Sequence, residues 1–447
     1  MKTYAKFADN EDLKTRLTKV DDTLNITSSG IPLMYDKNNL YIDDKDSHTL
    51  IIGSTGSGKT QTTVLPQLRL SIATGESIVV VDEMGDIYKT LGKELDKQKY
   101  KTLVINFQDT NKSNNFNPLQ LPYYLYKNKY EDQSIQIVEQ IADSIFKIEK
   151  GNSDPFWTNS AKNYFIGLTL YLFEHAKENE INYSSIYNLS IDIESKNKSK
   201  EILEKLDPTS AASINLTSIL LAPNETRGGI LSVFRQHLGL ITSKTCLNNL
   251  LANSDYNLFD LIDDKFAIFI IGEPLKYVSR QMTTVITEIY DVINIKGKHS
   301  KRINVILDRF TELQPFNSFH NILSRSRSLN IRYTILVDSL TSLELIYGKE
   351  ETLLIVNNIA SIIYLLTTDE QTNQIISGLI GEAKENTPLI SPIELKTLKM
   401  FEAIIIKVRE LPIKTKLMPD FKIPWEMSKE EKELPTRKEN IIKLYSI

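Results

Sequence analysis

The sequence has one cysteine, Cys246, among its 447 residues. A single cysteine can form neither an intramolecular disulfide nor a cysteine cluster for a metal, and this scarcity fits a reducing compartment. Histidine is also scarce, and its positions show none of the paired spacings that are typical of zinc ligands, so we expect no zinc site. The histidines are His48, His175, His237, His299 and His320.

Long apolar runs are absent as well. A membrane-spanning helix needs about 18 apolar residues, and no run in the sequence approaches that length. Residues 1–9 lack the apolar core of a signal peptide. We therefore expect a cytoplasmic protein. The 53 Lys and Arg against 57 Asp and Glu give a net charge of −4, so the chain is no polycation. This balance does not exclude DNA binding. A protein that passes DNA through a ring needs basic side chains only on the loops that line the channel of the ring.

A glycine loop is the clearest motif. The pattern GxxxxGK[ST] begins at Gly53 after a short apolar strand, and a helical spacing of apolar residues follows it from 61 to 72. Glycines let backbone N–H groups converge on an anion at the start of a helix. Lys59 would reach the β- and γ-phosphates and the Thr60 hydroxyl would bind Mg²⁺, so we predict an ATP and Mg²⁺ site. The predicted loop is Gly53, Ser54, Thr55, Gly56, Ser57, Gly58, Lys59 and Thr60.

Buried-strand patterns alternate with helical patterns in two parts of the chain, which predicts an α/β fold with a mainly parallel sheet. The strand patterns lie at 50–52, 78–82, 102–107, 266–272, 303–308, 333–337, 360–366 and 403–408. The region between these two parts is amphipathic and helical. We therefore expect a nucleotide-binding domain in two parts, 1–120 and 264–418, an all-helical insertion at 121–263, and a charged, solvated tail at 419–447. Residues 28–32 and 41–44 resemble hairpin or edge-strand sequence.

A second acidic residue at a neighbouring strand end is needed to complete the metal site. Asp82 and Asp308 both close buried-strand runs. We choose Asp308, because it lies about 250 residues after the loop and this spacing suits a sheet that is interrupted by a large insertion. A helix cap or turn residue is the alternative interpretation of a strand-end aspartate.

Six motifs follow one another in a single order. They are Gly53–Thr60, Asp154–Trp157 with Ser160 and Ala161, Leu307–Phe310, Arg325–Arg327, Leu343–Gly348 and Pro388–Ser391. Together they resemble the type IV secretion coupling proteins, which are the conjugative DNA-transfer ATPases of the TraG and TraD group. The resemblance extends over residues 5–416, nearly the whole chain.

This resemblance implies a RecA-like P-loop NTPase fold with an inserted all-helical domain. It also implies a homo-hexameric ring at the cytoplasmic mouth of a secretion channel. Lys59 and Thr60 match the positions that contact the phosphates and Mg²⁺, and Asp308 matches the metal position. Arg327 falls where the family has an arginine finger that reaches a neighbouring subunit's nucleotide. The predicted catalytic residues are therefore Lys59, Asp308 and Arg327, with Thr60 and Asp308 at the metal.

Two departures from the family pattern affect hydrolysis. Arg309 stands where the family has a glutamate that activates the attacking water, which an arginine cannot do. Asp338 stands where the family has a glutamine that senses the γ-phosphate. We hypothesise that Arg309 and Asp338 form a compensating ion pair. Three glutamates outside the family position could supply the missing carboxylate, namely Glu312, Glu83 and Glu273.

A third departure concerns the N-terminus. Most family members begin with two transmembrane helices, and this sequence begins within the segment that usually follows them, at Tyr4–Ala8. The anchor is therefore expected either to be missing from this sequence or to come from a partner protein.

The leading hypothesis is a ring-forming ATPase that docks relaxase-bound single-stranded DNA, or a secreted effector protein, and drives it into a type IV secretion channel. The alternative is a hydrolysis-deficient, nucleotide-binding receptor of the same apparatus. A chromosome-segregation or packaging motor shares the loop but does not account for Asp154–Trp157 or Leu343–Gly348. By analogy with the family, the helical insertion is expected to recognise cargo, although Phe156 and Trp157 there also suit a protein core.

Overall fold

The computed structural model describes residues 4–20, 26–36, 39–147, 154–439 and 441–447. Contacts divide the chain into two units, each assembled from separate segments. The first comprises residues 1–102, 264–270 and 296–433, and the second comprises 103–263, 271–295 and 434–447. The expected helical insertion, 121–263, falls within the second unit.

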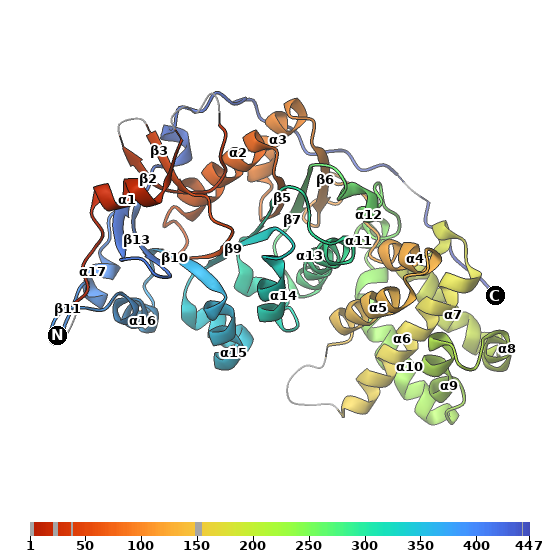
Figure 1. The fold of residues 1–447 in the computed structure, drawn as a ribbon. Helices are drawn as coiled ribbons and strands as arrows, with labels where there is room; N and C mark the ends of the chain where they lie inside the picture. Colours follow the sequence, from red (N-terminus) through yellow and green to blue (C-terminus); the bar gives the residue numbers. More distant parts are fainter. Residues whose placement is uncertain (1–3, 21–25, 37–38, 148–153, 440) are drawn as a thin grey trace. The chain divides into compact units, whose positions relative to one another are not determined.

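A nine-stranded sheet organises the first unit (Figure 1). Its strands run in the order β14-β13-β10-β4-β9-β8-β5-β7-β6. The bounds are β4 His48–Gly53, β5 Ser77–Asp82, β6 Lys101–Asn106, β7 Phe266–Ile271, β8 Ile303–Leu307, β9 Ile331–Val337, β10 Ile359–Leu366, β13 Glu402–Lys407 and β14 Ile413–Lys416. The neighbours from β10 to β5 pair in parallel, whereas β13 and β14 pair antiparallel. The mainly parallel sheet that the alternating pattern predicted is confirmed.

Helices cover both faces of this sheet, which is why the central strands are continuous apolar runs rather than alternating ones. Every residue of β4, β5, β8 and β9 is buried. Figure 1 shows α2 and α3 on one face and α14 and α15 on the other. The helices of this unit are α1 Asn10–Arg16, α2 Leu65–Thr74, α3 Asp86–Lys97, α14 Phe319–Ser326, α15 Leu340–Asn357, α16 Glu370–Ile380 and α17 Pro392–Lys396, with short helices η1 Thr60–Val64, η3 Phe310–Glu312 and η4 Asp420–Lys422.

Small antiparallel sheets complete the first unit. Strands β1 (Thr18–Val20), β3 (Asn39–Asp43) and β2 (Ile31–Asp36) form a three-stranded sheet in that order, as the hairpin or edge-strand pattern near the N-terminus predicted. Strands β11 (Glu382–Lys384) and β12 (Thr387–Pro388) form a two-stranded one.

His48 fixes the start of β4, the strand that leads into the glycine loop. Its Nδ1 accepts the Tyr333 N–H at 3.0 Å, so its Nε2 carries the proton that is donated to the Leu323 carbonyl at 2.8 Å. Burial lowers the pKa of His48 to about 4, and a nearby positive charge on Arg327 acts in the same direction. The neutral ring thus joins β4 to β9 and α14 through two hydrogen bonds.

The second unit is mainly helical. Its helices are α4 Gln120–Lys127, α5 Glu131–Ile145, α6 Pro155–His175, α7 Tyr183–Ser195, α8 Ser199–Lys205, α9 Ala211–Leu220, α10 Asn224–Thr242, α11 Thr245–Leu250, α12 Leu258–Leu261 and α13 Lys276–Lys296, with the short η2 Glu178–Glu180. Buried aromatic rings from three helices make part of its core, including Tyr164 against Phe234 at 5.1 Å between ring centroids. Trp157 packs on Gly229, where an added Cβ would lie 2.5 Å from the indole. Phe156 is about half exposed, so its interpretation as a core residue is wrong.

The C-terminal segment is not a wholly solvated tail, and that expectation is wrong for its first part. Asp420 accepts two hydrogen bonds from Arg69 of α2, at 2.8 Å from Nε and 3.0 Å from Nη2, and both side chains are buried. Trp425 lies under the same guanidinium, 5.9 Å from the ring centroid, in an apolar cluster with Leu70 and Ile423. A compact buried ion pair thus fixes this segment to the helix that follows the glycine loop.

Residues 441–447 are also held, in this case by polar side chains of the second unit. Asn182 donates its amide to the Lys443 carbonyl at 2.9 Å, and Lys196 donates to the Ile447 carbonyl at 2.8 Å.

Within the described ranges, no helix combines the length and apolar character that crossing a bilayer requires.

Candidate functional site

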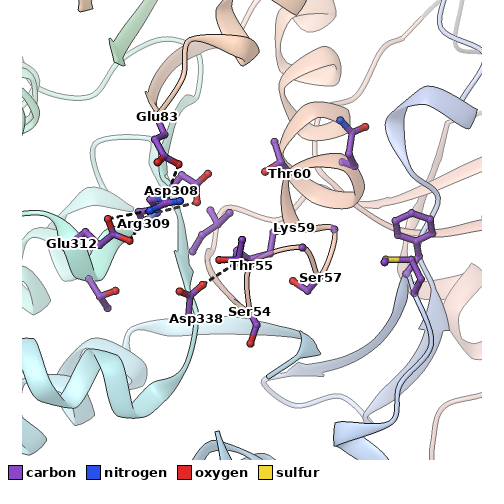
Figure 2. Close-up of a pocket in the computed structure, with 17 residues that line it drawn as sticks. Ser54, Thr55, Ser57, Lys59, Thr60, Glu83, Asp308, Arg309, Glu312 and Asp338 are labelled. Carbon is purple, nitrogen blue, oxygen red and sulfur yellow. Dashed lines mark hydrogen bonds and ion pairs between the residues drawn. The ribbon is translucent and has the colours of Figure 1, made fainter. Parts of the chain in front are cut away.

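The glycine loop joins the end of β4 to η1, and its backbone conformation depends on its glycines. Gly56 and Gly58 have φ of +80° and +93°, which side-chain-bearing residues rarely adopt. At Gly53 an added Cβ would lie 2.5 Å from the Ser57 Oγ, so a larger residue there would have to displace the serine side chain. The loop therefore curls tightly around a concave space (Figure 2).

Lys59 lies across this loop. Its Nζ donates a hydrogen bond to the Gly53 carbonyl and pairs with Asp338 Oδ1 at 3.0 Å. The lysine side chain is 13% exposed and that of Asp338 is 57% exposed. Asp338 follows β9, and β9 pairs with β4, which explains why this carboxylate reaches the lysine of the loop.

Asp308 directly follows β8 and faces the same pocket. Burial raises its pKa, while the backbone N–H of Arg309, at 2.9 Å, and the nearby Lys59 charge oppose that rise. Asp82, the alternative, does not line the pocket. Its carboxylate accepts the N–H groups of Gly85 at 3.1 Å and Tyr88 at 3.0 Å, which makes it a turn and helix-start residue. Burial raises the pKa of Asp82 to about 6.

Arg309 does not pair with Asp338, so the hypothesis of a compensating ion pair between them is wrong. Arg309 Nε lies 2.7 Å from Glu83 Oε2, and its Nη1 lies 3.1 Å from Glu312 Oε1. Strand order explains the difference. β8 has β9 on one side and β5 on the other, and Arg309 turns toward the β5 side, where Glu83 stands, while Asp338 turns toward Lys59.

The pocket has a volume of about 460 Å³. It is lined by the loop, by residues at or after the ends of β5, β8 and β9, and by two residues before β13. These residues are Ser54, Thr55, Gly56, Ser57, Gly58, Lys59, Thr60, Gln61, Glu83, Asp308, Arg309, Thr311, Glu312, Leu336, Asp338, Met400 and Phe401. Four carboxylates and two cations are thus gathered in one place (Figure 2). Within the described ranges, no group of three or more His, Cys, Asp and Glu residues has the geometry of a metal site.

Sequence reasoning missed part of this pocket. Phe401 packs over the loop, because a Cβ at Gly58 would lie 3.1 Å from its ring, and Phe401 itself has φ of +70°. No motif signalled Phe401 or Met400, since both precede an ordinary strand far from the loop in sequence. Arg327 and Glu273, which the sequence did single out, do not line the pocket. Arg327 is exposed at the end of α14.

Several polar groups of the loop have no hydrogen-bond partner among the described residues. The Ser57 Oγ is buried and has no hydrogen-bond partner among the described residues. The backbone N–H groups of Thr55, Gly56 and Gly58 likewise have no acceptor in the described part of the chain. Unsatisfied donors at the start of a helix, with a lysine beside them, match the chemistry of a phosphate group.

The sequence of the chain matches a known protein family. Residues 6–384 match the model of the type IV secretory system conjugative DNA transfer family. The chain belongs to this family. The resemblance to type IV secretion coupling proteins that the six motifs suggested is therefore confirmed. No curated protein sequence matches the chain.

Solved structures with the same fold include members of the conjugative DNA transfer apparatus. The plasmid coupling protein TrwB in complex with ADP and Mg²⁺ is 14% identical, with a TM-score of 0.72 and 97% of each chain covered. A trigonal form of TrwBdeltaN70 with sulphate is 14% identical with a TM-score of 0.72, over 97% of this chain and 98% of that one. VirB4 of Thermoanaerobacter pseudethanolicus is 14% identical with a TM-score of 0.56, over 89% of this chain and 98% of that one. The RecA-like P-loop fold with a helical domain is confirmed for this family member.

Proposed function

We propose that this coupling protein binds ATP with Mg²⁺ at the glycine loop and uses its hydrolysis to drive conjugative DNA transfer. The observation that carries the proposal is the convergence of Lys59, Thr60 and Asp308 on one pocket beside unsatisfied donors of the loop. TrwB, which shares the fold, has been solved with ADP and Mg²⁺ and with a non-hydrolysable ATP analogue.

Each residue of the site has a role that its chemistry supports. The backbone of residues 53–60 and the Ser57 hydroxyl hold phosphate oxygens, and Lys59 neutralises their charge. The Thr60 hydroxyl and the Asp308 carboxylate are oxygen ligands of the kind that Mg²⁺ prefers. The carboxylates of the pocket outnumber its cationic side chains and would repel the phosphates. A Mg²⁺ ion held there would reduce this repulsion.

The assembly that we propose is a homo-hexameric ring in which Arg327 acts on the nucleotide of a neighbouring subunit. Its exposed position outside the pocket of its own chain supports a role in trans. The cargo would be relaxase-bound single-stranded DNA or a secreted effector. The ring would work with the secretion-channel proteins at the cytoplasmic face of the membrane, held there by an anchor or by a partner. Binding to DNA phosphates should weaken steeply with salt.

The first test is steady-state ATP hydrolysis with and without single-stranded DNA, in the wild type and in Lys59→Ala and Asp308→Ala. Loss of one preorganised charged contact is expected to lower turnover about 10²- to 10³-fold. The matched control is Lys349→Ala, an exposed lysine of α15 outside the pocket. DNA-stimulated turnover that survives in Lys59→Ala would contradict the proposed site.

A second candidate is a nucleotide-binding receptor that recruits cargo without hydrolysis. Arg309 in the position of the family's catalytic glutamate favours it, because the guanidinium cannot take a proton from water. The pairing of Lys59 with Asp338 favours it as well. Nucleotide binding that depends on Lys59, combined with the absence of turnover under every condition, would support the receptor over the motor.

A further inference from the structure

Glu83 lies beside Arg309 and offers a carboxylate where Arg309 cannot act as a base. Strands β5 and β8 are parallel neighbours, with Val81 opposite Leu307 at their ends. Two residues further along each strand direction come Glu83 and Arg309, whose side chains meet at 2.7 Å. The carboxylate that is missing at position 309 is thus present one strand away, at the same edge of the sheet and in the same pocket.

The backbone turn after β5 and an ion pair with Arg309 together position Glu83. The preceding residue, Asp82, accepts the N–H groups of Gly85 and Tyr88, which closes the turn after β5 and fixes the backbone on both sides of Glu83. The guanidinium of Arg309 then holds the carboxylate itself. Arg309 has φ of +51°, an unfavourable conformation for a residue with a side chain, which this pair helps to maintain.

Glu312 is the competing carboxylate, and the geometry ranks it second. It belongs to the short helix η3 rather than to a strand end, and its side chain is 41% exposed against 29% for Glu83. A more exposed group on a one-turn helix is held less firmly in a productive position than a group at the end of a buried strand. Glu312 bonds Arg309 from the other side, at 3.1 Å.

We infer that Glu83 is the general base for ATP hydrolysis and that Arg309 is the positioning residue that orients it. The inference rests on the proposed ATP-binding function. In this step one carboxylate oxygen of Glu83 takes a proton from water while the water oxygen bonds to the terminal phosphorus. The bond from that phosphorus to the bridging oxygen breaks, and its electron pair leaves with ADP. Glu83 then passes the proton to the phosphate product or to solvent.

The test compares three single substitutions of the same kind, Glu83→Gln, Glu312→Gln and the control Glu350→Gln, an exposed glutamate of α15 outside the pocket. Loss of a general base costs about 10²- to 10⁴-fold. We expect that fall in kcat for Glu83→Gln, less than a ten-fold fall for Glu312→Gln, and wild-type turnover for Glu350→Gln. Affinity for a non-hydrolysable ATP analogue should stay within about three-fold of the wild type in all three, because a base acts on water and not on the phosphates.

Two further readouts separate catalysis from structure. Acetate or formate should restore part of the turnover of Glu83→Gly, since a small carboxylate can occupy the vacated space, and should not affect Lys59→Ala. For Arg309, Arg309→Ala should lower kcat with little change in KM, and Arg309→Lys should recover part of it. Because Arg309 acts through Glu83, adding Arg309→Ala to Glu83→Gln should lower kcat only a little further. The two substitutions should therefore be non-additive in a double-mutant cycle.

Each outcome decides the matter. A fall confined to Glu83→Gln, with rescue by carboxylates, supports the inference. Near-normal turnover in Glu83→Gln, or a larger fall in Glu312→Gln, overturns it while ATP hydrolysis by the chain stands. No turnover in the wild type also overturns it, and nucleotide binding that requires Lys59 in the same preparation would leave the proposed nucleotide site intact. A chain that neither binds nor hydrolyses ATP would overturn the proposed function as well.

Discussion

Replacing Asp338 should tighten nucleotide binding at the proposed site, because its carboxylate already pairs with Lys59. In the structure the lysine ammonium already has an anionic partner at 3.0 Å. A phosphate group must displace this carboxylate or share the lysine with it. Asp338→Asn keeps the shape of the side chain and removes its charge, so the lysine becomes available without any competing pair.

The size of the effect follows from the geometry of the pair. Coulomb's law gives about 1.4 kcal/mol for two unit charges at this separation in bulk water. Because Asp338 is 57% exposed, desolvation and side-chain entropy reduce the net value to that of exposed pairs, about 0.2 to 1 kcal/mol. Removing the like charge of Asp338 from the surroundings of the phosphates acts in the same direction. We therefore expect an affinity gain of about five-fold, equivalent to about 1 kcal/mol.

The assay is equilibrium titration of a fluorescent ATP analogue against wild type and Asp338→Asn at several salt concentrations. The gain should shrink as salt rises, since the pair is partly exposed and screened. Glu350→Gln, an exposed glutamate of α15 outside the pocket, is the control for the change in net charge. Equal or weaker binding by Asp338→Asn would refute the reasoning, because it would show that the carboxylate assists the bound state instead of competing with it.

Two predictions concern the stability of the first unit. Asp420→Ala should lower its free energy of unfolding by about 3 to 5 kcal/mol in denaturant titration, because the buried Arg69 loses its partner, and adding Arg69→Met should recover most of that loss. Between pH 7 and pH 5 the stabilising effect of His48 should fall by about 2 kcal/mol, because the unfolded chain takes up a proton below its usual pKa of about 6.5 while the folded ring, with a pKa of about 4, does not. This loss should be seen as a shrinking difference between wild type and His48→Gln, and a constant difference would contradict it.

The sequence predicted the nucleotide loop and the sheet well because both depend on local patterns. Glycines at fixed spacing, followed by Lys59 and Thr60, specify one backbone conformation whatever surrounds them. Runs of buried apolar residues specify the strands, since a parallel sheet that is covered on both faces admits few polar residues. The choice of Asp308 over Asp82 as the metal residue stays a prediction, and of the two only Asp308 lines the pocket.

Side-chain pairing across the site could not be predicted in this way. It depends on strand order, and the sequence alone does not reveal that β9 lies between β4 and β8 while β5 lies beyond β8. Without that order, Arg309 and Asp338 looked like natural partners because each follows a core strand and each departs from the family. The packing of the Pro419–Met427 segment was missed because its apolar residues follow neither a helical nor a strand period, and the segment is held by a buried ion pair and an apolar cluster instead.

Strand order also makes the two departures from the family independent of one another. Asp338 pairs with Lys59 on the β4 side of the site, whereas Arg309 pairs with Glu83, which follows β5, and with Glu312 of η3. Because the two sets of ion pairs share no residue, we expect the first to affect how tightly nucleotide is held and the second to affect how water is activated. A chain with this arrangement can lose the glutamate beside Asp308 and still place a carboxylate at the same edge of the sheet. The substitution at Arg309 is therefore better understood as a relocation of the base than as its loss.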